Sequence, residues 1–430
     1  MKNFKVSIVF GLFLILFGLD SCVDIDDTLL DIASKDVITK DSELFELISK
    51  VTKEGVNPTE NIVCLDFIYP FKVLIYDPDR NITGNKILGG DKHFSDFLGS
   101  LNSSQSISIS YPIRTTLADG TVFSVTNNSE LKLAIDSCSK EDIISYCSGL
   151  FGTPPGTCVW KIPYTADGDN KYATGFFESN GDGTLNFTYN NVYYTGTWVF
   201  LFVDNKLHIN INLAGTSQVA KDLNIDSDIE FTADEIKIAG SPKNITLRKS
   251  CQATKEYTIG KNGPAGGLVF YDKGSYSSGW RYMEVAPTDL GFFEWGCLGS
   301  QVPDSDRSEL GLGFYNAVKT ANYHDGLLDY YLNPSICNAL NNGTVVAKNA
   351  LLFELNNHKD WFLPSKDELK LVYENLYLQS IGGFSNSKFW TSSQIDANTV
   401  QTIDFKTGID TPQNKIPVPN NIKARAVRYF

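Results

Sequence analysis

The sequence is poor in the residues from which many enzyme and metal sites are built. It has 430 residues but only four histidines and two methionines, and no two of its eight cysteines form a C-x-x-C pair. Neither H-E-x-x-H nor G-x-S-x-G occurs in it. These absences argue against a zinc knuckle, a thioredoxin-type redox site and two common classes of hydrolase. We therefore expect a protein that is not an enzyme and that has no obligatory cofactor.

Basic residues are scarce as well. Lys and Arg number 37 against 50 Asp and Glu, which gives a formal net charge of −13. Beyond the first few residues, no basic cluster stands out along the chain. Because binding to nucleic-acid phosphates requires a basic face, a nucleic-acid partner is not expected.

Long apolar runs are also missing. The longest, Val6–Leu19, has 14 residues and follows two lysines, which is too short for a membrane span and typical of a signal peptide over residues 1–21. The run ends in Leu-Asp-Ser-Cys and is similar to a bacterial lipobox, although Asp20 stands where a small or apolar residue is usual. We expect lipidation at Cys22 and anchoring to a membrane. The alternative is plain secretion, with Cys22 in a disulfide.

The segment after Cys22 is acidic. Val-Asp-Ile-Asp-Asp follows the cysteine directly and resembles the surface-export signal of Bacteroidetes-type lipoproteins. This resemblance implies an outer-membrane lipoprotein that is exposed on the cell surface. Residues 22–60 are interpreted as an acidic tether with one amphipathic helix over residues 44–51.

The rest of the chain divides into three units, and its patterns predict a β-rich, multidomain α+β protein. Residues 61–150 contain a faint repeat, in which "CLDFIYPFKV" (64–73) and "SISISYPIRT" (106–115) place alternating apolar residues before Tyr-Pro. A helix start follows each of them, at 91–101 and 128–138. Two strand-helix units of about forty residues predict a small α+β domain.

Residues 151–252 alternate apolar and polar positions between Asn-Gly, Asp-Gly and Asp-Asn turns. This pattern predicts an up-and-down antiparallel meander and resembles small lipocalin-like domains. "ESNGDG" (178–183) is more simply a hairpin turn than a calcium loop, because no later bidentate glutamate follows it.

Residues 253–430 carry several motifs in order. "DWFLPSKDEL" (360–369) predicts a short buried strand, a stop at Pro364 and a helix start capped by Ser365 and Glu368. The order of motifs resembles the Lcl C-terminal domain family, first noticed at the end of bacterial collagen-like adhesins. The residues that carry the resemblance are Trp280, Arg281, Trp361, Pro364, Ser365, Glu368, Trp390, Arg425 and Arg428. It implies a C-type-lectin-like fold that is shared with formylglycine-generating enzymes.

Two features depart from the family pattern. A longer segment, "ANYHDGLLDYYLNPSICNALNNG", replaces a compact helix between Val318 and Trp361. The stretch "ANTVQTIDF" (397–405) lacks a tryptophan that relatives tend to have after the Phe-Trp strand. If that indole lines a surface site in relatives, the site is altered in this chain.

The cysteines fit an oxidising compartment. Seven remain besides Cys22, so at least one thiol is free or pairs between chains. Positions at the ends of units make Cys64 with Cys138 and Cys158 with Cys251 candidate pairs. Cys297 with Cys337 is expected as a structural disulfide within the C-terminal unit, although pairing cannot be read from sequence.

Candidate ligand-binding residues lie in the C-terminal unit. Trp295, with its neighbour Glu294, is the tryptophan to test for stacking on a sugar ring, while Trp280, Trp361 and Trp390 are expected in the core. Arg425 and Arg428 are expected to pair with carboxylates. The glycine-rich "GKNGPAGG" (260–267) runs into a strand rather than a helix, which favours a turn over a phosphate site.

Calcium is possible because lectin-like folds often use it. Its oxygen ligands would come from the acidic loop with Asp304, Asp306 and Glu309, or from Asp396 and Asn398. An exposed acidic loop without metal is the simpler interpretation. We expect non-catalytic binding of a glycan or of a host or matrix protein. A structural or assembly role and a divergent enzyme of the formylglycine-generating-like fold are the alternatives.

Overall fold

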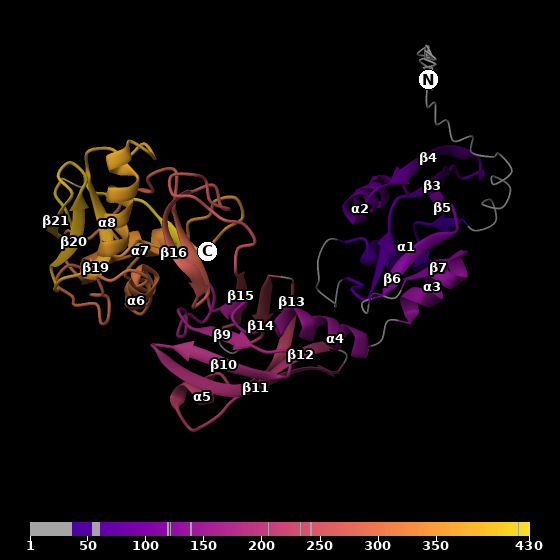
Figure 1. The fold of residues 1–430 in the computed structure, drawn as a ribbon, viewed down its shortest axis with the longest axis horizontal. Helices are drawn as coiled ribbons and strands as arrows, with labels where there is room; N and C mark the ends of the chain where they lie inside the picture. Colours follow the sequence, from indigo (N-terminus) through magenta and orange to yellow (C-terminus); the bar gives the residue numbers. More distant parts are fainter. Residues whose placement is uncertain are drawn as a thin grey trace, which may run out of the picture.

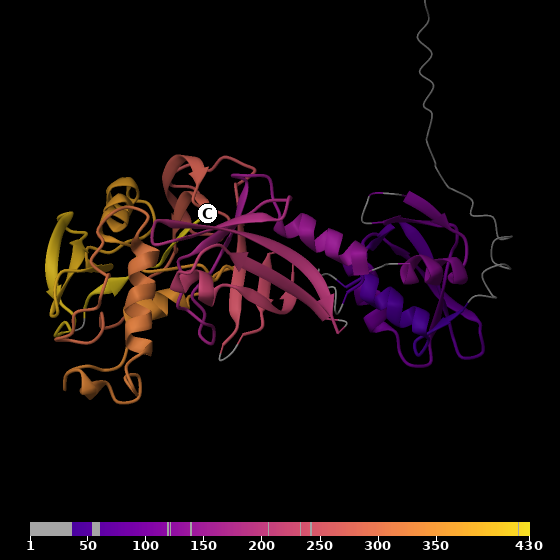
Figure 2. The same ribbon diagram turned by 90° about the horizontal axis from the view of Figure 1, so that it is seen from below.

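The computed structural model describes residues 37–53, 61–117, 120, 122–137, 140–204, 206–232, 234–240, 243–419 and 421–430. They form three units in a row (Figures 1 and 2): an N-terminal unit, a barrel and a C-terminal unit. The protein is therefore β-rich and of mixed α+β class, as predicted. The expected signal peptide and Cys22 lie outside the described residues. Among the described helices, none has the length and apolar character needed to cross a membrane.

The N-terminal unit has two small antiparallel sheets and three helices. Its strands are β1 (Ile38–Thr39), β2 (Leu65–Ile68), β3 (Phe71–Tyr76), β4 (Ile82–Leu88), β5 (Ser106–Ile109), β6 (Ile113–Leu117) and β7 (Val122–Val125). Its helices are α1 (Glu43–Val51), α2 (Asp91–Ser100) and α3 (Asn128–Asp136). One sheet has the order β1-β5-β3-β4 and the other β2-β6-β7.

The predicted repeat is present, and its two copies exchange strands. Each copy has two strands joined by Tyr-Pro, a third strand and a helix. The first strand of each copy pairs with the second strand of the other, so β2 lies beside β6 and β5 beside β3. Tyr69 donates a hydrogen bond to Asp91 at the start of α2, and Tyr111 donates one to Asn128 at the start of α3, both at 2.7 Å.

Part of the predicted tether belongs to this unit instead. Strand β1 pairs with β5, and α1 buries Phe45, Ile48 and Val51 in the same core. The helix predicted over residues 44–51 is therefore confirmed, but its role as part of a tether is wrong. Cys64 is held in a disulfide; Cys138, its expected partner, lies outside the described residues.

The second unit is a closed antiparallel barrel of eight strands, in which every strand pairs with its neighbours in sequence. The strands are β8 (Cys158–Lys161), β9 (Phe176–Ser179), β10 (Thr184–Tyr189), β11 (Val192–Val203), β12 (Lys206–Leu213), β13 (Ile225–Phe231), β14 (Glu235–Ile238) and β15 (Ile245–Cys251). Helix α5 (Gln218–Asp222) lies between β12 and β13. The up-and-down meander is confirmed, and residues 178–183 end strand β9 and form the β9–β10 turn over 180–183.

Aromatic side chains fill the barrel. Trp160, Phe177, Phe187 and Phe200 are buried inside it. Helix α4 (Lys140–Phe151) leads from the N-terminal unit to the barrel (Figures 1 and 2), and its last residue, Phe151, packs against Trp160 with ring centroids 5.3 Å apart. The indole of Trp160 donates a hydrogen bond to the carbonyl of Phe151 at 3.0 Å. The barrel is thus plugged by the helix that precedes it.

The Cys158–Cys251 disulfide joins the first and last strands of the barrel. This confirms the predicted pair. Cys147, on α4, is a free and buried thiol among the described cysteines, which agrees with the odd number in the sequence. Burial raises the pKa of Cys147 to about 12, so the thiol stays protonated at neutral pH.

The C-terminal unit packs helices against two sheets, of order β16-β17-β23 and β18-β22-β19-β20-β21. The strands are β16 (Leu268–Ser277), β17 (Trp280–Val285), β18 (Gly291–Phe292), β19 (Lys388–Gln394), β20 (Thr399–Asp404), β21 (Ile409–Asn414), β22 (Lys423–Ala424) and β23 (Val427–Tyr429). The helices are α6 (Gly313–Asp325), α7 (Val346–Leu351) and α8 (Lys366–Asn375), with short 3-10 turns η3 (Pro334–Ile336) and η4 (Tyr377–Gln379).

The corner at residues 360–376 forms largely as predicted. Ser365 and Glu368 make the capping box at the start of α8, and Leu369 and Val372 face the core. The expected strand over 360–363 is reduced to one bridge between Phe362 and Val427. Glu368 also accepts hydrogen bonds from the amides of Gly311 and Gly313, so its carboxylate fixes the start of α6 as well.

Candidate functional site

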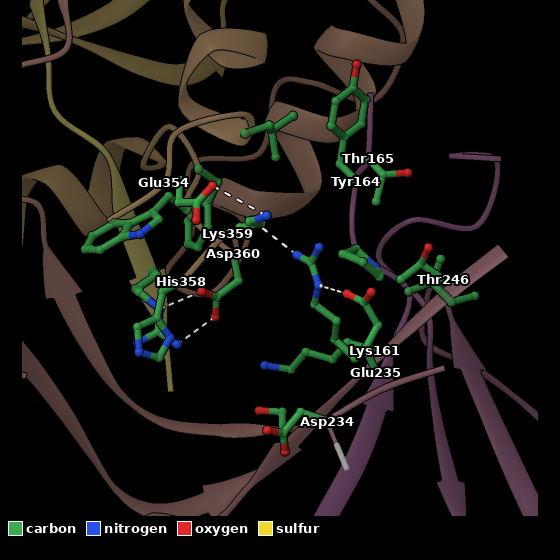
Figure 3. A pocket seen from close by; sticks show the side chains of 18 of the residues that line it. Lys161, Tyr164, Thr165, Asp234, Glu235, Thr246, Glu354, His358, Lys359 and Asp360 are labelled. Atoms are coloured by element: carbon green, nitrogen blue, oxygen red, sulfur yellow. Dashed lines mark hydrogen bonds and ion pairs between the residues drawn. The ribbon is translucent and has the colours of Figure 1, made fainter. Parts of the chain in front are cut away.

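The candidate site is a cleft of about 1160 Å³ between the barrel and the C-terminal unit. Strands β8, β14 and β15 line one wall with their outward-facing side chains, and the segment 354–362 and strand β23 line the other. Figure 3 shows Lys161 and Glu235 on the barrel side and Glu354, His358 and Asp360 across from them. We call this space the cleft.

The two walls are held together by contacts on both sides of the cleft. The hydroxyl of Tyr164 donates to Asp325 at 2.5 Å, and the side-chain amide of Asn322 donates to the carbonyl of Asn170 at 2.9 Å. Near the other end, Tyr276 donates to the carbonyl of Ser250 at 2.6 Å. Buried apolar residues of both units also form one continuous core. The cleft is therefore bounded by two units that pack directly against each other.

The C-terminal wall is built around Arg428. Its guanidinium donates to both carboxylate oxygens of Asp360 at 2.8 Å and to Glu284 at 2.7 Å. Burial acts to raise the pKa of Asp360, but the charge and hydrogen bonds of Arg428 outweigh it and hold that pKa below its usual value. Asp360 is therefore an ionised carboxylate at neutral pH, with Arg428 as its fixed partner.

The glycine-rich loop closes around this network from behind. The amides of Ala265 and Gly267 donate to the Glu284 carboxylate at 3.2 and 2.9 Å. A Cβ atom on Gly263 would lie 2.4 Å from that carboxylate, so the loop depends on glycine there. The loop over 260–267 is thus a turn, as predicted. Its backbone donors bind an anion of the protein itself.

The barrel wall carries a row of three charged residues on adjacent strands. Glu235 of β14 lies opposite Arg248 of β15, and Arg248 lies opposite Lys161 of β8. Glu235 accepts a hydrogen bond from Arg248 at 2.9 Å. Trp160 faces the barrel interior, and because strand side chains alternate, its neighbour Lys161 faces outward into the cleft.

Lys161 is half-buried and lies among charges of both signs. Burial lowers its pKa to about 8; Asp360 opposes this shift, while Arg428 and Lys273 add to it. Figure 3 shows its side chain extending across the cleft toward the C-terminal unit. Among the described residues, no ion pair or hydrogen bond partner is found for its amine.

The remaining polar groups of the cleft include His358 and Trp361. Burial, with a smaller effect of Arg428, lowers the pKa of His358, so its ring is neutral at pH 7. The indole N–H of Trp361 is buried and has no acceptor among the described residues. Together the walls offer amines, guanidinium groups, carboxylates and amides at fixed positions, which is the chemistry that orients a polar ligand.

Trp295 and Glu294, the sequence candidates for sugar stacking, lie in the core. Trp295 is fully buried, with its indole donating to the carbonyl of Thr391 at 2.9 Å. Glu294 is also buried and accepts a hydrogen bond from Tyr330 at 2.9 Å. The prediction of a surface site at these residues is wrong, because the glycine beside Trp295 allows a tight turn into the core and not an exposed ring.

The acidic candidates for calcium are not brought together. Asp304, Asp306 and Glu309 are exposed, and the part of the chain that the structure describes contains no group of three acidic, His or Cys side chains that could hold a metal. Asp396 accepts hydrogen bonds from the amides of Asn398 and Thr399. Asp396 and Asn398 therefore form the tip of the β19–β20 hairpin and face solvent.

The other motif residues have structural roles. Trp361 and Trp390 are buried, and Trp280 stacks on Tyr429 with ring centroids 4.8 Å apart. Arg425 pairs with Asp289 at 2.6 Å, as expected of a carboxylate partner. The Cys297–Cys337 disulfide is present and ties the long insertion to the rest of the unit.

The cleft was not predicted from the sequence. Asp360 and Arg428 were found as parts of structural motifs, but Lys161, Glu235 and Arg248 carry no local signal of a site. No protein-family model matches the chain, and no curated protein matches it.

Proposed function

We propose that the protein is a non-catalytic binding protein that takes a polar ligand of glycan size into the cleft. The volume of the cleft, about 1160 Å³, lies above the range of about 300–1000 Å³ that is usual for small-molecule sites. A chain of sugar residues would fill it better than a single small metabolite. This cleft between two packed units is the single observation on which the proposal rests.

The lining supports a ligand rich in hydroxyl groups. Paired charges such as Arg248–Glu235 and Arg428–Asp360 are already oriented before a ligand enters, so binding does not require their ordering. The carboxylates can accept from sugar hydroxyls, while the amines and guanidinium groups donate to sugar oxygens.

The setting in which this binding takes place is also a proposal. The N-terminal pattern supports a lipoprotein anchored through Cys22 and displayed on the outer membrane. The order of motifs over residues 253–430 supports membership of the Lcl C-terminal domain family and a lectin-like fold. Both features fit a surface protein that binds glycan or matrix material.

A broad glycan array probed with the purified protein tests this function. We expect binding to a defined glycan class and its loss when Asp360 is replaced by Leu, with folding verified by circular dichroism. Repeating the array with calcium and with a chelator separates the cleft from a metal-dependent site. If the folded protein binds no glycan under either condition, the proposed function is refuted.

A second candidate function, assembly of surface complexes, is favoured by the long insertion after α6. The segment 327–343 projects from the C-terminal unit (orange, lower left in Figure 2) and exposes Leu328 by 83%, Leu332 by 90% and Leu340 by 63%. It contains one acidic residue and no basic one. An exposed apolar patch of this kind is typical of a protein contact.

A second copy of the chain is the partner that this candidate commits to, because apolar loops can bury each other in a two-fold contact. Sedimentation velocity of the wild type and of a Leu328→Ser, Leu332→Ser variant tests it. Concentration-dependent association that the variant loses would support assembly. A monomer at every concentration would refute self-assembly through this loop.

A further inference from the structure

Lys161 differs from the other cations that line the cleft. The others are Lys237, Arg248, Lys249, Lys359 and Arg428. Four of these have carboxylate partners: Glu230 for Lys237, Glu235 for Arg248, Glu354 for Lys359, and both Asp360 and Glu284 for Arg428. Lys249 donates to the carbonyl of Leu150 at 2.6 Å. Among the described residues, only Lys161 in this set lacks any such partner.

The strand register explains why Lys161 has no ion-pair or hydrogen-bond partner on the barrel wall. Its cross-strand neighbours are Arg248 on β15 and Phe176 on β9, one a like charge and the other apolar. Glu235, the acid in the same row, is already paired with Arg248 at 2.9 Å. Across the cleft, both oxygens of Asp360 accept from Arg428. The fold therefore offers Lys161 a position but no acceptor.

The stem of Lys161 nevertheless packs against the C-terminal unit. A Cβ atom on Gly279 would lie 2.7 Å from Cε of Lys161, so the lysine stem packs closely on that glycine. An exposed surface lysine, by contrast, is mobile and fully hydrated. Lys161 thus presents its amine at a defined place in a partly enclosed space.

A ligand that binds in the cleft beside Lys161 changes the stability of its charged amine. Burial already disfavours the charged amine and lowers its pKa to about 8. A neutral ligand would remove more water and disfavour the charge further, whereas an anionic ligand would supply the missing partner. The gain in binding free energy from Lys161 is therefore greatest for a ligand that carries negative charge.

The surroundings favour one negative charge rather than two. The carboxylates of Asp167 and Asp234 also line the cleft. Lys161 is the one cation of the described lining without a partner, and Asp360 lies close enough to affect its pKa. A phosphate dianion would meet that carboxylate with one charge unmatched, while a carboxylate would be neutralised by the amine.

We propose that the ligand of the cleft is an acidic glycan and that Lys161 binds the carboxylate of one of its uronic-acid residues. This inference rests on the proposed function, since it names the ligand class for the same cleft. It assigns Lys161 as the residue that discriminates acidic from neutral glycans.

The test compares two forms of one ligand. An oligogalacturonide and its methyl ester have the same chain length and ring geometry but differ in charge. Isothermal titration calorimetry with the purified full chain is expected to show at least about tenfold tighter binding of the acid, the effect of one charge-assisted contact. The Lys161→Gln variant is expected to lose that preference. Lys206→Gln is the matched control and should bind as the wild type does, because Lys206 is a barrel lysine outside the cleft lining that is paired with Asp228 at 2.7 Å.

A glycan array with acidic and neutral members completes the design. Binding of acidic glycans only, lost in Lys161→Gln and kept in Lys206→Gln, supports the inference. Binding of neutral glycans, or acid binding that Lys161→Gln retains, overturns the inference and leaves the proposed function standing. If the folded wild type binds no glycan at all, both are overturned. Thermal unfolding of each variant verifies that a lost signal does not reflect a lost fold.

Discussion

Replacing Arg428 by methionine is expected to destabilise the C-terminal unit strongly. The substitution keeps most of the side-chain volume but removes the guanidinium that bonds to Asp360 and Glu284. Glu284 is fully buried, so its carboxylate would remain in the protein interior without a counter-ion. Removing one partner of a buried ion pair typically costs about 3–5 kcal/mol.

Two details place the expected cost near the lower end of that range. Glu284 keeps its hydrogen bonds from the amides of Ala265 and Gly267, and the side chain of Asp360 is 36% exposed, so water can hydrate it. We therefore expect a loss of about 3 kcal/mol in the free energy of unfolding. Adding Glu284→Gln to Arg428→Met removes the orphaned charge and should restore part of this loss, with a coupling of about 1–3 kcal/mol between the two sites.

Equilibrium unfolding in urea measures these differences, with tryptophan fluorescence as the signal. Four of the six tryptophans lie in residues 253–430, so the transition of this unit dominates the change. Lys359→Met is the matched control: it removes another cation of the cleft, but its pair with Glu354 is 3.5 Å long and about half exposed on both sides. Its expected cost is below about 1 kcal/mol. If Arg428→Met costs no more than Lys359→Met, the view that Arg428 holds this wall together is refuted.

Three further outcomes are expected. Phe151→Ala should cost about 3–5 kcal/mol in urea unfolding, because it removes the aromatic ring that plugs the barrel. Gly263→Ala should cost about 1–3 kcal/mol in the same assay, because the added methyl group would overlap the Glu284 carboxylate. Burial lowers the pKa of His324 to about 4, so between pH 6.5 and 4 the unfolded chain binds more protons than the native state. The free energy of unfolding should therefore fall as pH decreases through this window, and His324→Gln should flatten that slope.

The two packing predictions each have a control variant. Tyr193 lies on the outer face of the barrel and is 72% exposed; Tyr193→Ala should change stability by less than about 0.5 kcal/mol. A Cβ atom at Gly149, on α4, would meet no neighbouring atom, so Gly149→Ala should be neutral or slightly stabilising. Equal losses of stability in test and control variants would contradict the packing arguments. If His324→Gln leaves the pH dependence of stability unchanged, that dependence arises from other titrating groups.

Local patterns were sufficient to predict several elements of the fold. The period of two in Trp198, Phe200, Leu207 and Ile209 predicted barrel strands, since a strand that buries one face must alternate. The capping box at Ser365 formed because its hydrogen bonds connect residues three positions apart. Such features depend on residues that are close in sequence, and they can therefore be predicted without a structure.

The cleft and the strand exchange were not predictable in the same way. Lys161 and Asp360 are about two hundred positions apart, and nothing near either residue indicates the other. Trp295 failed as a candidate for a related reason. Its burial is fixed by Thr391, a contact far along the chain, and the glycine beside it gave no information on which side of the turn the ring would lie.

The exchange of strands in the N-terminal unit makes its two repeats inseparable. Strand β2 is completed by β6 and strand β5 by β3, so either repeat alone would leave an unpaired edge in both sheets. A protease cut in the connection between α2 and β5, residues 101–105, would yield two fragments that stay associated through interlocked strands. A single repeat, produced alone, would be completed by a second copy of itself. This geometry describes how a two-chain ancestor could have become one chain by duplication and fusion without any change in pairing.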